Sequence, residues 1–306
     1  MRQFTIIVPF HAAQGTIDET LKSLRAQSFH DWEMICVNDR SPDKSAQIVA
    51  RHAESDPRIR LVESHGAGPS EARNYAAKLA NSELLAFCDA DDIWAPDKLA
   101  ELAKVFESSD VSGVFGQIAF FRHDCGDCRT KSTVPNDDLT IAGLLAENPV
   151  CTMSNFTVRR YAFHGVGGFD AKIVHNEDLD LLIRLIGKGH RIAGTNSLQV
   201  WYRTAPEGLS ADLSAMRRGR ACAIRSAARY GVVPNPASEA VYLRYLARRS
   251  LRLDADPKAA GHYALEGLRT DAKAFLFPLR RGVATAIAAF LARLMTPRLR
   301  RALFTR

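Results

Sequence analysis

The sequence predicts an α/β fold, a three-layer arrangement with a mostly parallel central sheet between helices, followed by an α-helical C-terminal region. Three observations lead to this prediction. Over the first 120 residues, short apolar runs alternate with amphipathic segments, and polar residues directly follow several of these runs. Beyond about residue 213 no strand is expected, and Ala-, Leu- and Arg-rich segments at helical period take over. Regular alternation of strand and helix is typical of parallel sheets, because each crossover between parallel neighbours requires a helix-length connection.

The individual elements are predicted from run length, residue type and period. Apolar, β-branched runs indicate buried strands, and apolar residues at three- and four-residue spacing indicate helices, the first of them with Thr16 as its cap. The expected strands are 5–8, 33–37, 58–62, 84–88, 111–121, 150–159 and 191–202, and the expected helices are 16–28, 44–54, 70–79, 96–106, 178–187, 214–229, 238–252, 258–270 and 281–295. Segment 122–136 is polar and irregular.

Charge divides the chain into two parts. Residues 1–215 contain 22 Lys and Arg against 29 Asp and Glu, whereas residues 216–306 contain 19 against 5, so the net charge of +7 originates in the second part. We therefore expect one domain over residues 1–213 and a basic α-helical region over residues 214–306. Nucleic acid is not an expected partner, because the first part is acidic and the second carries no known nucleic-acid-binding motif.

Hydropathy and cysteine content indicate a cytoplasmic protein. The longest stretch without Asp, Glu, Lys or Arg is residues 3–17, whereas a membrane-spanning helix needs about 20 mostly apolar residues. Cys36 and Cys88 lie in apolar runs, where cysteine behaves as a small buried hydrophobic residue. Cys125 and Cys128 form a single C-x-x-C, which without a second pair is weak evidence for zinc. The sequence therefore favours a reducing compartment and excludes a polytopic membrane protein.

Candidate ligand-binding residues follow the predicted strands. Ligands of open parallel sheets bind beyond the carboxyl ends of the strands, which here precede His11, residues 38–39 and the acidic run 89–92. Clustered carboxylates suit Mg²⁺ or Mn²⁺, which take carboxylate oxygens and often share their coordination shell with substrate phosphates. A polar turn that caps the next helix is the alternative interpretation of the acidic run.

Four segments together carry a resemblance to a known family. They are V-P-F-H at 8–11, N-D-R-S-P-D at 38–43, G-P-S-E-A-R-N at 68–74 and D-A-D-D at 89–92. In order and spacing they resemble the family 2 glycosyltransferases, inverting enzymes of the GT-A fold that use nucleotide-sugar donors. The resemblance covers residues 1–215. It departs from the family pattern at His11, Ala12 and Asn38, where Tyr, Asn and Asp are usual.

This resemblance implies a donor site. Asp39 would accept a hydrogen bond from the nucleotide base, and since uracil offers an N–H donor there and cytosine does not, a UDP-linked sugar is expected. Arg73 would approach the base or the phosphates, with a surface salt bridge as the alternative. The implied nucleotide-sugar-binding residues are Pro9, His11, Asp39, Arg73, Asp89, Ala90 and Asp91. Asp91 and Asp89 would also hold Mn²⁺ or Mg²⁺.

The second half of the domain resembles the base-bearing part of the same family. G-G-F-D at 167–170 precedes E-D-L-D-L-L-I-R at 177–184, which is similar to the family pattern E-D-x-D-L-x-x-R. The resemblance implies that Asp178 is the base that takes the proton from the acceptor hydroxyl, and that Glu177 orients the acceptor or donor. We expect the helix N-terminus to lower the pKa of Asp178. A charged first helical turn is the alternative interpretation.

A third segment resembles the family pattern Y-R-x-H-x-x-S-x-S. It consists of W-Y-R at 201–203 and G-L-S at 208–210, with Ala205 in the usual His position. We therefore expect no equivalent here of the phosphate or metal contact that this His makes in the family.

The basic region predicts contact with a membrane surface. Residues 282–295 are nearly all apolar, and the arginines around them are Arg280, Arg281, Arg293, Arg298, Arg300 and Arg301. This composition suits an interfacial helix on anionic lipid, and an arginine-rich solvated face is the alternative. We therefore expect a cytoplasmic enzyme that is peripheral on the inner face of the cell membrane.

The expected function is metal-dependent, inverting transfer of a sugar from a nucleotide donor to a hydroxyl of a glycan or lipid-linked acceptor, in cell-envelope polysaccharide synthesis. The alternative is a non-catalytic subunit that binds a sugar nucleotide or assists assembly. A nucleotidyltransferase is disfavoured, because residues 11–15 do not form the Gly-rich, basic phosphate loop that such enzymes usually carry after the first strand.

Overall fold

The structure is a computed structural model that describes residues 2–64, 66, 68–122, 124–128, 130–204, 212–253 and 256–304. The chain forms two compact units, the first made of Met1–Leu139 and Pro149–Ala205 and the second of Thr140–Asn148 and Pro206–Arg306. Segment 140–148 thus leaves the first unit to join the second. The expected division between residues 213 and 214 stays a prediction, and it assigned this segment to the first domain.

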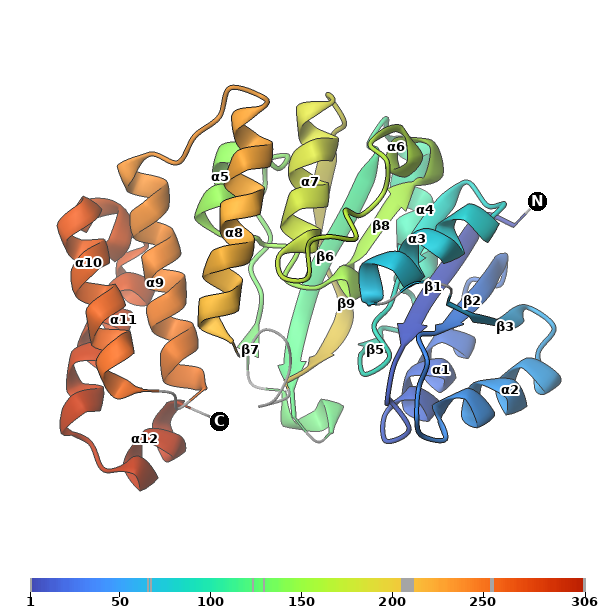
Figure 1. Cartoon of the computed structure of the whole chain (residues 1–306), viewed down its shortest axis with the longest axis horizontal. Helices are drawn as coiled ribbons and strands as arrows, with labels where there is room; N and C mark the ends of the chain where they lie inside the picture. The colour runs from blue at the N-terminus through green and yellow to red at the C-terminus, as the bar shows by residue number, and fades with distance from the viewer. Residues whose placement is uncertain are drawn as a thin grey trace. The chain divides into compact units, whose positions relative to one another are not determined.

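A nine-stranded sheet forms the centre of the first unit (Figure 1). Its order is β3–β2–β1–β4–β8–β6–β9–β5, with β7 paired to β6. The strands are β1 (Phe4–Phe10), β2 (Trp32–Asn38), β3 (Ile59–Glu63), β4 (Leu84–Phe87), β5 (Ile93–Trp94), β6 (Gly113–Phe121), β7 (Thr130–Lys131), β8 (Phe156–Arg159) and β9 (Ile192–Arg203). The β3–β2, β2–β1, β1–β4 and β6–β9 pairings are parallel, and the remaining pairings are antiparallel.

Strand β1 lies at the centre of the parallel half, and all seven of its residues are buried. Such burial is typical of a strand with neighbours on both sides and helices on both faces. Pairing with β4 ends at Ile7 opposite Phe87, while pairing with β2 continues to Phe10. Pro9, which has no N–H to donate, therefore lies where β4 has already ended, and no ladder hydrogen bond to β4 is lost.

Helices cover both faces of this half of the sheet. On one face, helices α1 (Ile17–Arg25), α2 (Ser45–Ser55) and α4 (Lys98–Ser108) share a hydrophobic core with β1. This core includes Phe4, Ile6 and Val8 of β1, Leu21 and Leu24 of α1, Val49 of α2, and Leu102 and Phe106 of α4. Helix α3 (Pro69–Leu79) contacts β1 and β2 with buried residues that lie outside this core (Figure 1). The predicted three-layer arrangement is confirmed.

Several short elements differ from the predictions. Thr16 precedes α1 but does not cap it; its hydroxyl donates instead to the carbonyl of Ala90, 2.9 Å away. The sequence did not indicate β5, β7, α5 (Ile141–Ala146), α6 (Arg160–Gly165) or α12 (Pro297–Phe304). Elements of two to eight residues are too short to display a period. Helix α7 (Glu177–Gly187) begins one residue before its predicted start.

The second unit is α-helical. Besides α5 and α12 it contains α8 (Leu213–Ala228), α9 (Pro236–Arg252), α10 (Pro257–Leu276) and α11 (Leu279–Leu291). Helix α10 is interrupted at Asp271, which has non-helical dihedrals, one residue after the predicted helix 258–270 ends. The Asp271 carboxylate accepts a hydrogen bond from Ala274 N and so caps the part that follows. Buried Arg220 of α8 donates to Glu239 of α9, 2.8 Å away, and to the carbonyl of Leu145 in α5, 2.9 Å away.

The close approach of β6 and β9 requires Gly116. A Cβ atom at this position would lie 2.2 Å from Cγ of Gln199 and 2.9 Å from the carbonyl oxygen of Ser197. We expect Gly116→Ala to lower the free energy of unfolding by about 1–3 kcal/mol, the usual effect of overpacking. Urea unfolding measures it. Gly165→Ala is the control, because nothing lies within 4 Å of a Cβ there; equal effects of the two substitutions would contradict this packing.

Candidate active site

The loops that follow β1, β2 and β4 meet at the carboxyl edge of the parallel strands. The Asp39 main chain joins the first two: its N–H donates to the Phe10 carbonyl, 2.9 Å away, and its carbonyl oxygen lies 2.8 Å from His11 Nδ1. Pro9 is buried within β1, and the Ala90 carbonyl is occupied by Thr16. Four residues of the predicted donor site thus lie in these loops or at the strand end, as the strand-end rule requires.

The Asp39 carboxylate is buried beside the start of α3. Its Oδ2 accepts a hydrogen bond of 2.7 Å from the N–H of Gly68, whose φ of 92° is readily adopted only by glycine. Its Oδ1 has no hydrogen-bond partner among the described residues and lies 3.5 Å from Arg40 Nε. One oxygen is therefore fixed by the protein, and the other remains available to accept a hydrogen bond from a ligand.

Arg73 of α3 joins the acidic run to the start of α7. Its guanidinium donates to Asp89 Oδ1 at 2.6 Å and to Glu177 Oε1 at 3.2 Å. The side chain is only 5% exposed, so the alternative of a surface salt bridge is wrong. Burial opposes its charge, but the two carboxylates outweigh burial and raise the pKa of Arg73. We call Arg73, Asp89 and Glu177 the Arg73 cluster.

Asn74, the next residue, fixes the loop that precedes α7. Its side chain donates to the Phe169 carbonyl at 2.8 Å and accepts from Phe169 N at 2.9 Å. The ring of Phe169 lies 5.3 Å from the Arg73 guanidinium. Gly168 has a φ of 70°, and a Cβ there would lie 2.5 Å from Asn74 Oδ1. The A-R-N and G-G-F-D segments therefore hold each other in place.

A second layer of contacts, which the sequence did not reveal, supports the acidic run. The Thr152 hydroxyl lies 3.1 Å from Asp89 Oδ2 and 3.4 Å from Asp92 Oδ2, and Ser154 Oγ accepts from Asp89 N at 2.8 Å. Lys98 donates from Nζ to the Ser154 carbonyl at 2.6 Å, and burial lowers its pKa to about 7. In the sequence, the only sign of these contacts was the polar pair Thr152 and Ser154 within segment 150–159, which was predicted to be extended. In the structure this segment contains a short 3₁₀ turn (Met153–Asn155) followed by β8.

Arg203, at the end of β9, completes the support of the acidic run. Its Nε donates to the Asp91 carbonyl at 2.9 Å, and its main-chain N–H donates to Asp92 Oδ1 at 3.0 Å. Burial and the negative charge of Asp89 raise the pKa of Asp91 to about 6. Asp92 is fully buried, and burial raises its pKa well above the usual range. The rest of the third resembling segment, with Ala205 and Gly208–Ser210, lies outside the described residues.

The chemistry of Asp89 and Asp91 fits a hard divalent cation. The described part of the chain contains no group of three or more His, Cys, Asp or Glu side chains arranged to hold a metal ion. Two carboxylates are nevertheless a usual protein contribution to a Mg²⁺ or Mn²⁺ site that takes its remaining ligands from water and substrate phosphates. The raised pKa of Asp91 indicates an excess of buried negative charge, which a bound cation would relieve.

Asp178 lies in the first turn of α7, next to Glu177 of the Arg73 cluster. The expectation that the helix N-terminus lowers its pKa is wrong: burial, followed by the charge of Glu177, raises the pKa to about 7. Arg73 and hydrogen bonds from main-chain N–H groups favour the ionised form but do not compensate. A carboxylate with this pKa can exchange a proton near neutral pH, which suits a general base.

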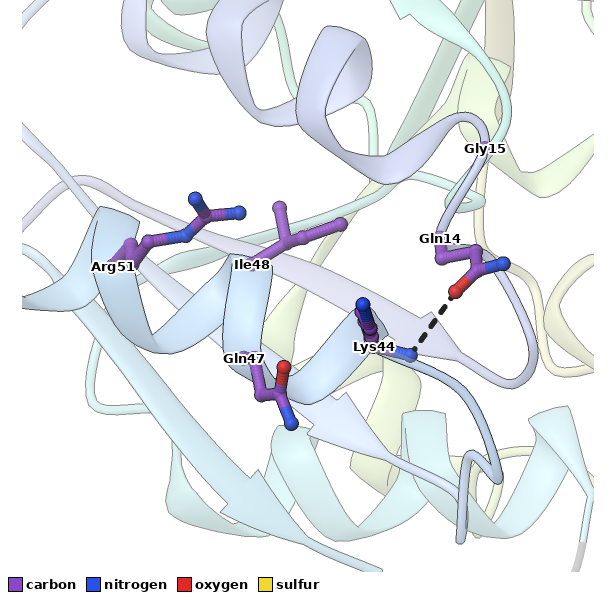
Figure 2. A pocket seen from close by; sticks show the side chains of 6 residues that line it. All are labelled: Gln14, Gly15, Lys44, Gln47, Ile48 and Arg51. Carbon is purple, nitrogen blue, oxygen red and sulfur yellow. Dashed lines mark hydrogen bonds between the residues drawn. The ribbon is translucent and has the colours of Figure 1, made fainter.

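Two other features of the first unit involve none of the Arg73 cluster residues. Cys125 opens a 3₁₀ turn (Cys125–Asp127), and the zinc question stays open because His123 lies outside the described residues. Figure 2 shows a pocket lined by Gln14, Gly15, Lys44, Gln47, Ile48 and Arg51, where Gln14 Oε1 accepts from Lys44 N. None of these six residues belongs to the Arg73 cluster or its supports.

Comparison with known proteins identifies the family. The family model described as glycosyl transferase family 2 matches residues 5–167, more than half of the chain. The chain belongs to this family. The predicted family is thus confirmed, and the four segments that predicted it lie within the matched range.

Several curated relatives are similar to this chain. The putative teichuronic acid biosynthesis glycosyltransferase TuaG of Bacillus subtilis is 38% identical over 210 residues, which cover 68% of this chain and 81% of TuaG. The β-1,3-glucosyltransferase WfgD of Escherichia coli, named for UDP-Glc and α-D-GlcNAc-diphosphoundecaprenol, is 34% identical over 113 residues, 37% of this chain and 44% of WfgD. Two further curated relatives are matched over only 26% and 35% of their length.

The solved structures confirm the fold. The mannosyltransferase PcManGT of Pyrobaculum calidifontis, in complex with GDP-Man and Mn²⁺, is 23% identical, with a TM-score of 0.62 over 99% of this chain and 83% of that one. Residues 1–349 of Staphylococcus aureus TarS, in complex with UDP, are 18% identical, with a TM-score of 0.60 over 95% and 91% of the two chains. The likeness supports the predicted GT-A type fold of this chain.

The Thr152 contacts give a prediction for the stability of the protein. Thr152→Val removes a buried hydroxyl that bonds to carboxylates, so we expect the free energy of unfolding to fall by about 1.5–3 kcal/mol. Thr157→Val is the matched control: this threonine is also buried, but its hydroxyl has no hydrogen-bond partner in the described structure. Chemical denaturation should show no loss for the control, and an equal loss in both variants would contradict a supporting role of Thr152.

Proposed function

We propose that this chain is an inverting glycosyltransferase that moves a sugar from a nucleotide donor to a hydroxyl group of an acceptor. The observation that carries the proposal is the Arg73 cluster, in which one buried guanidinium contacts both Asp89 of the D-A-D-D segment and Glu177 of the E-D-x-D segment. Residues for donor and base chemistry are thereby held at one place. Family membership supports the same reaction class.

For the donor we propose a UDP-sugar. Asp39 Oδ1, which is buried and accepts no hydrogen bond from the described residues, suits the N–H of a uracil ring. A buried carboxylate oxygen without a hydrogen bond is unfavourable even beside the Arg40 guanidinium, so a donor that fills this position gains affinity. WfgD is named for UDP-Glc and the TarS complex contains UDP, while PcManGT is in complex with GDP-Man. Thermal-shift titrations with UDP- and GDP-sugars therefore decide between the two bases.

In the transfer step, Asp178 acts as the base. Its carboxylate takes the proton of the acceptor hydroxyl while that oxygen bonds to the anomeric carbon; the bond from this carbon to the diphosphate oxygen breaks, and the configuration inverts. Glu177 orients the acceptor or donor, and its carboxylate is itself fixed by Arg73. His11 and Pro9 shape the donor side next to Asp39.

Asp91 and Asp89 would hold Mn²⁺ or Mg²⁺. When bound, such an ion stabilises the negative charge that develops on the departing diphosphate. Asp89 is the more constrained of the two residues, because Arg73 and Thr152 contact its two oxygens. Asp91 is therefore the residue whose loss should affect metal-dependent donor binding most directly.

The acceptor we propose is a glycan or a lipid-linked glycan of the cell envelope. The names of TuaG and WfgD, which refer to teichuronic acid biosynthesis and to a diphosphoundecaprenol-linked sugar, support this assignment. Among the described residues, no helix is both long and apolar enough to cross a membrane. We propose a peripheral position at the inner face of the cell membrane. Absence of both donor hydrolysis and transfer with a broad acceptor panel would favour the alternative, a non-catalytic sugar-nucleotide-binding subunit.

The base assignment predicts the effect of Asp178→Asn. Without a proton acceptor at this position, we expect kcat to fall by about 10²–10⁴-fold while UDP binding is unchanged. Transfer kinetics and isothermal titration with UDP measure the two properties. Asp137→Asn, which changes an exposed acid of the same unit, is the control and should retain full activity. Full turnover by Asp178→Asn would refute the assignment.

The raised pKa of Asp178 predicts a pH dependence. Since only the ionised carboxylate accepts a proton, we expect kcat to rise about tenfold per pH unit below about pH 7 and to level off above it. The residual activity of Asp178→Asn should lack this rise. A profile that is flat from pH 5 to 8 in the unsubstituted enzyme would contradict base catalysis by a group with this pKa.

The metal assignment predicts that Asp91→Asn weakens Mn²⁺-dependent donor binding by at least about tenfold, because it removes one of two charged ligands. Calorimetric titration of UDP with and without Mn²⁺ measures it, and in Asp178→Asn the Mn²⁺ dependence should persist. Equal UDP affinity in Asp91→Asn and the unsubstituted protein, at matched Mn²⁺, would rule Asp91 out as a ligand.

A further inference from the structure

Helix α11 exposes a row of large apolar side chains, with exposed Arg280 at its first turn. The exposed side chains are Leu279, Val283, Ile287, Phe290, Leu291 and, just beyond the helix, Leu294, with exposed fractions from 38% for Val283 to 84% for Leu294. Their spacing of three or four residues places them on one face, because an α-helix has 3.6 residues per turn. We call these six residues the α11 face. Single exposed apolar residues are common, but a contiguous row of this kind marks an interaction site.

The fold of the second unit does not need the α11 face. The opposite side of α11 is the buried one: Gly282, Thr285 and Ala289 are covered, and Ala289 belongs to a core with Phe275 of α10 and Ala247 of α9. A Cβ at Gly282 would lie 2.2 Å from the carbonyl oxygen of Leu276, so the backbones approach closely on that side. Helix α11 is therefore apolar on both sides, and packing within its unit uses only one of them.

Positive charge surrounds the α11 face. Residues 272–306 contain eight Lys and Arg and no Asp or Glu. Four of these arginines, Arg280, Arg293, Arg298 and Arg301, are exposed. Helix α12 repeats the arrangement on a smaller scale, with exposed Leu299 and Leu303 one turn apart. The chemistry that complements such a surface is an apolar layer bordered by anions.

We propose that the α11 face, with the leucines of α12, lies in the interface of a bilayer that contains anionic lipid. The apolar side chains would enter the boundary of the acyl chains, and the exposed arginines would contact the headgroups, as in other interfacial helices. Pairing with a second copy of the chain is less favourable, because a two-fold axis would bring the same arginines together. The inference rests on the proposed function only for the acceptor, since a lipid-linked acceptor would be reached at this surface.

Co-sedimentation of the full chain with vesicles tests the inference. Vesicles of phosphatidylcholine with phosphatidylglycerol should bind the protein at low salt, and vesicles of phosphatidylcholine alone should bind it weakly. The double variant Ile287→Ser/Leu294→Ser should bind anionic vesicles at least tenfold more weakly. The matched control is Tyr161→Ser/Val233→Ser, which changes two large exposed residues elsewhere, 62% and 68% exposed against 54% and 84% for Ile287 and Leu294, and should bind as the unsubstituted chain does.

The arginines are tested separately. The variants Arg280→Gln, Arg298→Gln and Arg301→Gln should each lose affinity by about fivefold at low salt, as expected for a basic residue near anionic lipid. Arg218→Gln, at an exposed arginine of α8, is the control and should lose little. Donor hydrolysis in solution should stay unchanged in all these variants, so a failure of the proposed chemistry and a failure of membrane binding are distinguishable.

Two results would overturn the inference. One is equal binding of the Ile287→Ser/Leu294→Ser variant and its control to anionic vesicles. The other is a dimer of the unsubstituted chain in light scattering that Ile287→Ser/Leu294→Ser abolishes, while anionic vesicles bind neither the unsubstituted chain nor this variant. That result would assign the α11 face to a second copy of the chain.

Discussion

The contact of Arg73 with Asp89 and Glu177 is the interaction on which the site depends. Each partner comes from a different element: Arg73 from α3, Asp89 from the loop after β4, and Glu177 from the start of α7. A buried arginine with one carboxylate would leave little net charge, but here two carboxylates share one guanidinium. Removing the arginine would leave these two partly exposed acids close together without the cation between them, which is unfavourable. A single side chain therefore joins the acidic run to the start of α7.

The surroundings of this contact place several negatively charged side chains close together. Asp89, Asp91 and Asp92 lie in one run. Besides Arg73, Arg203 contacts Asp91 and Asp92 of this run, and Lys98 contacts the turn that supports it. Burial lowers the pKa of Lys98 to about 7 and raises those of Asp91 and Asp92. The protein thus compensates the charge only in part. The divalent cation that we propose for Asp89 and Asp91 would compensate the remaining charge.

The sequence was sufficient for features that depend on local pattern. The strand-end rule located Asp39 and Asp89, because parallel strands place their following loops at one edge. The start of α7 was found to within one residue from its apolar period. The supports Thr152, Asn74 and Lys98 were missed, since each acts through a partner distant in the chain. The prediction that the pKa of Asp178 is lowered was also wrong, because the end of a helix can be recognised in a sequence whereas the burial of a side chain cannot.

The place of segment 140–148 has a consequence for how this protein can be divided. Ile141, Leu144 and Leu145 of α5 are buried within the helical unit, where α5 contacts α8 and α9 and Arg220 holds the Leu145 carbonyl. Glu147 pairs with Arg281 of α11. A gene shortened after residue 213 would still encode α5 but none of the helices that cover it. The helical unit therefore cannot be removed by truncation alone. A soluble fragment of the first unit would also require the apolar residues of α5 to be replaced.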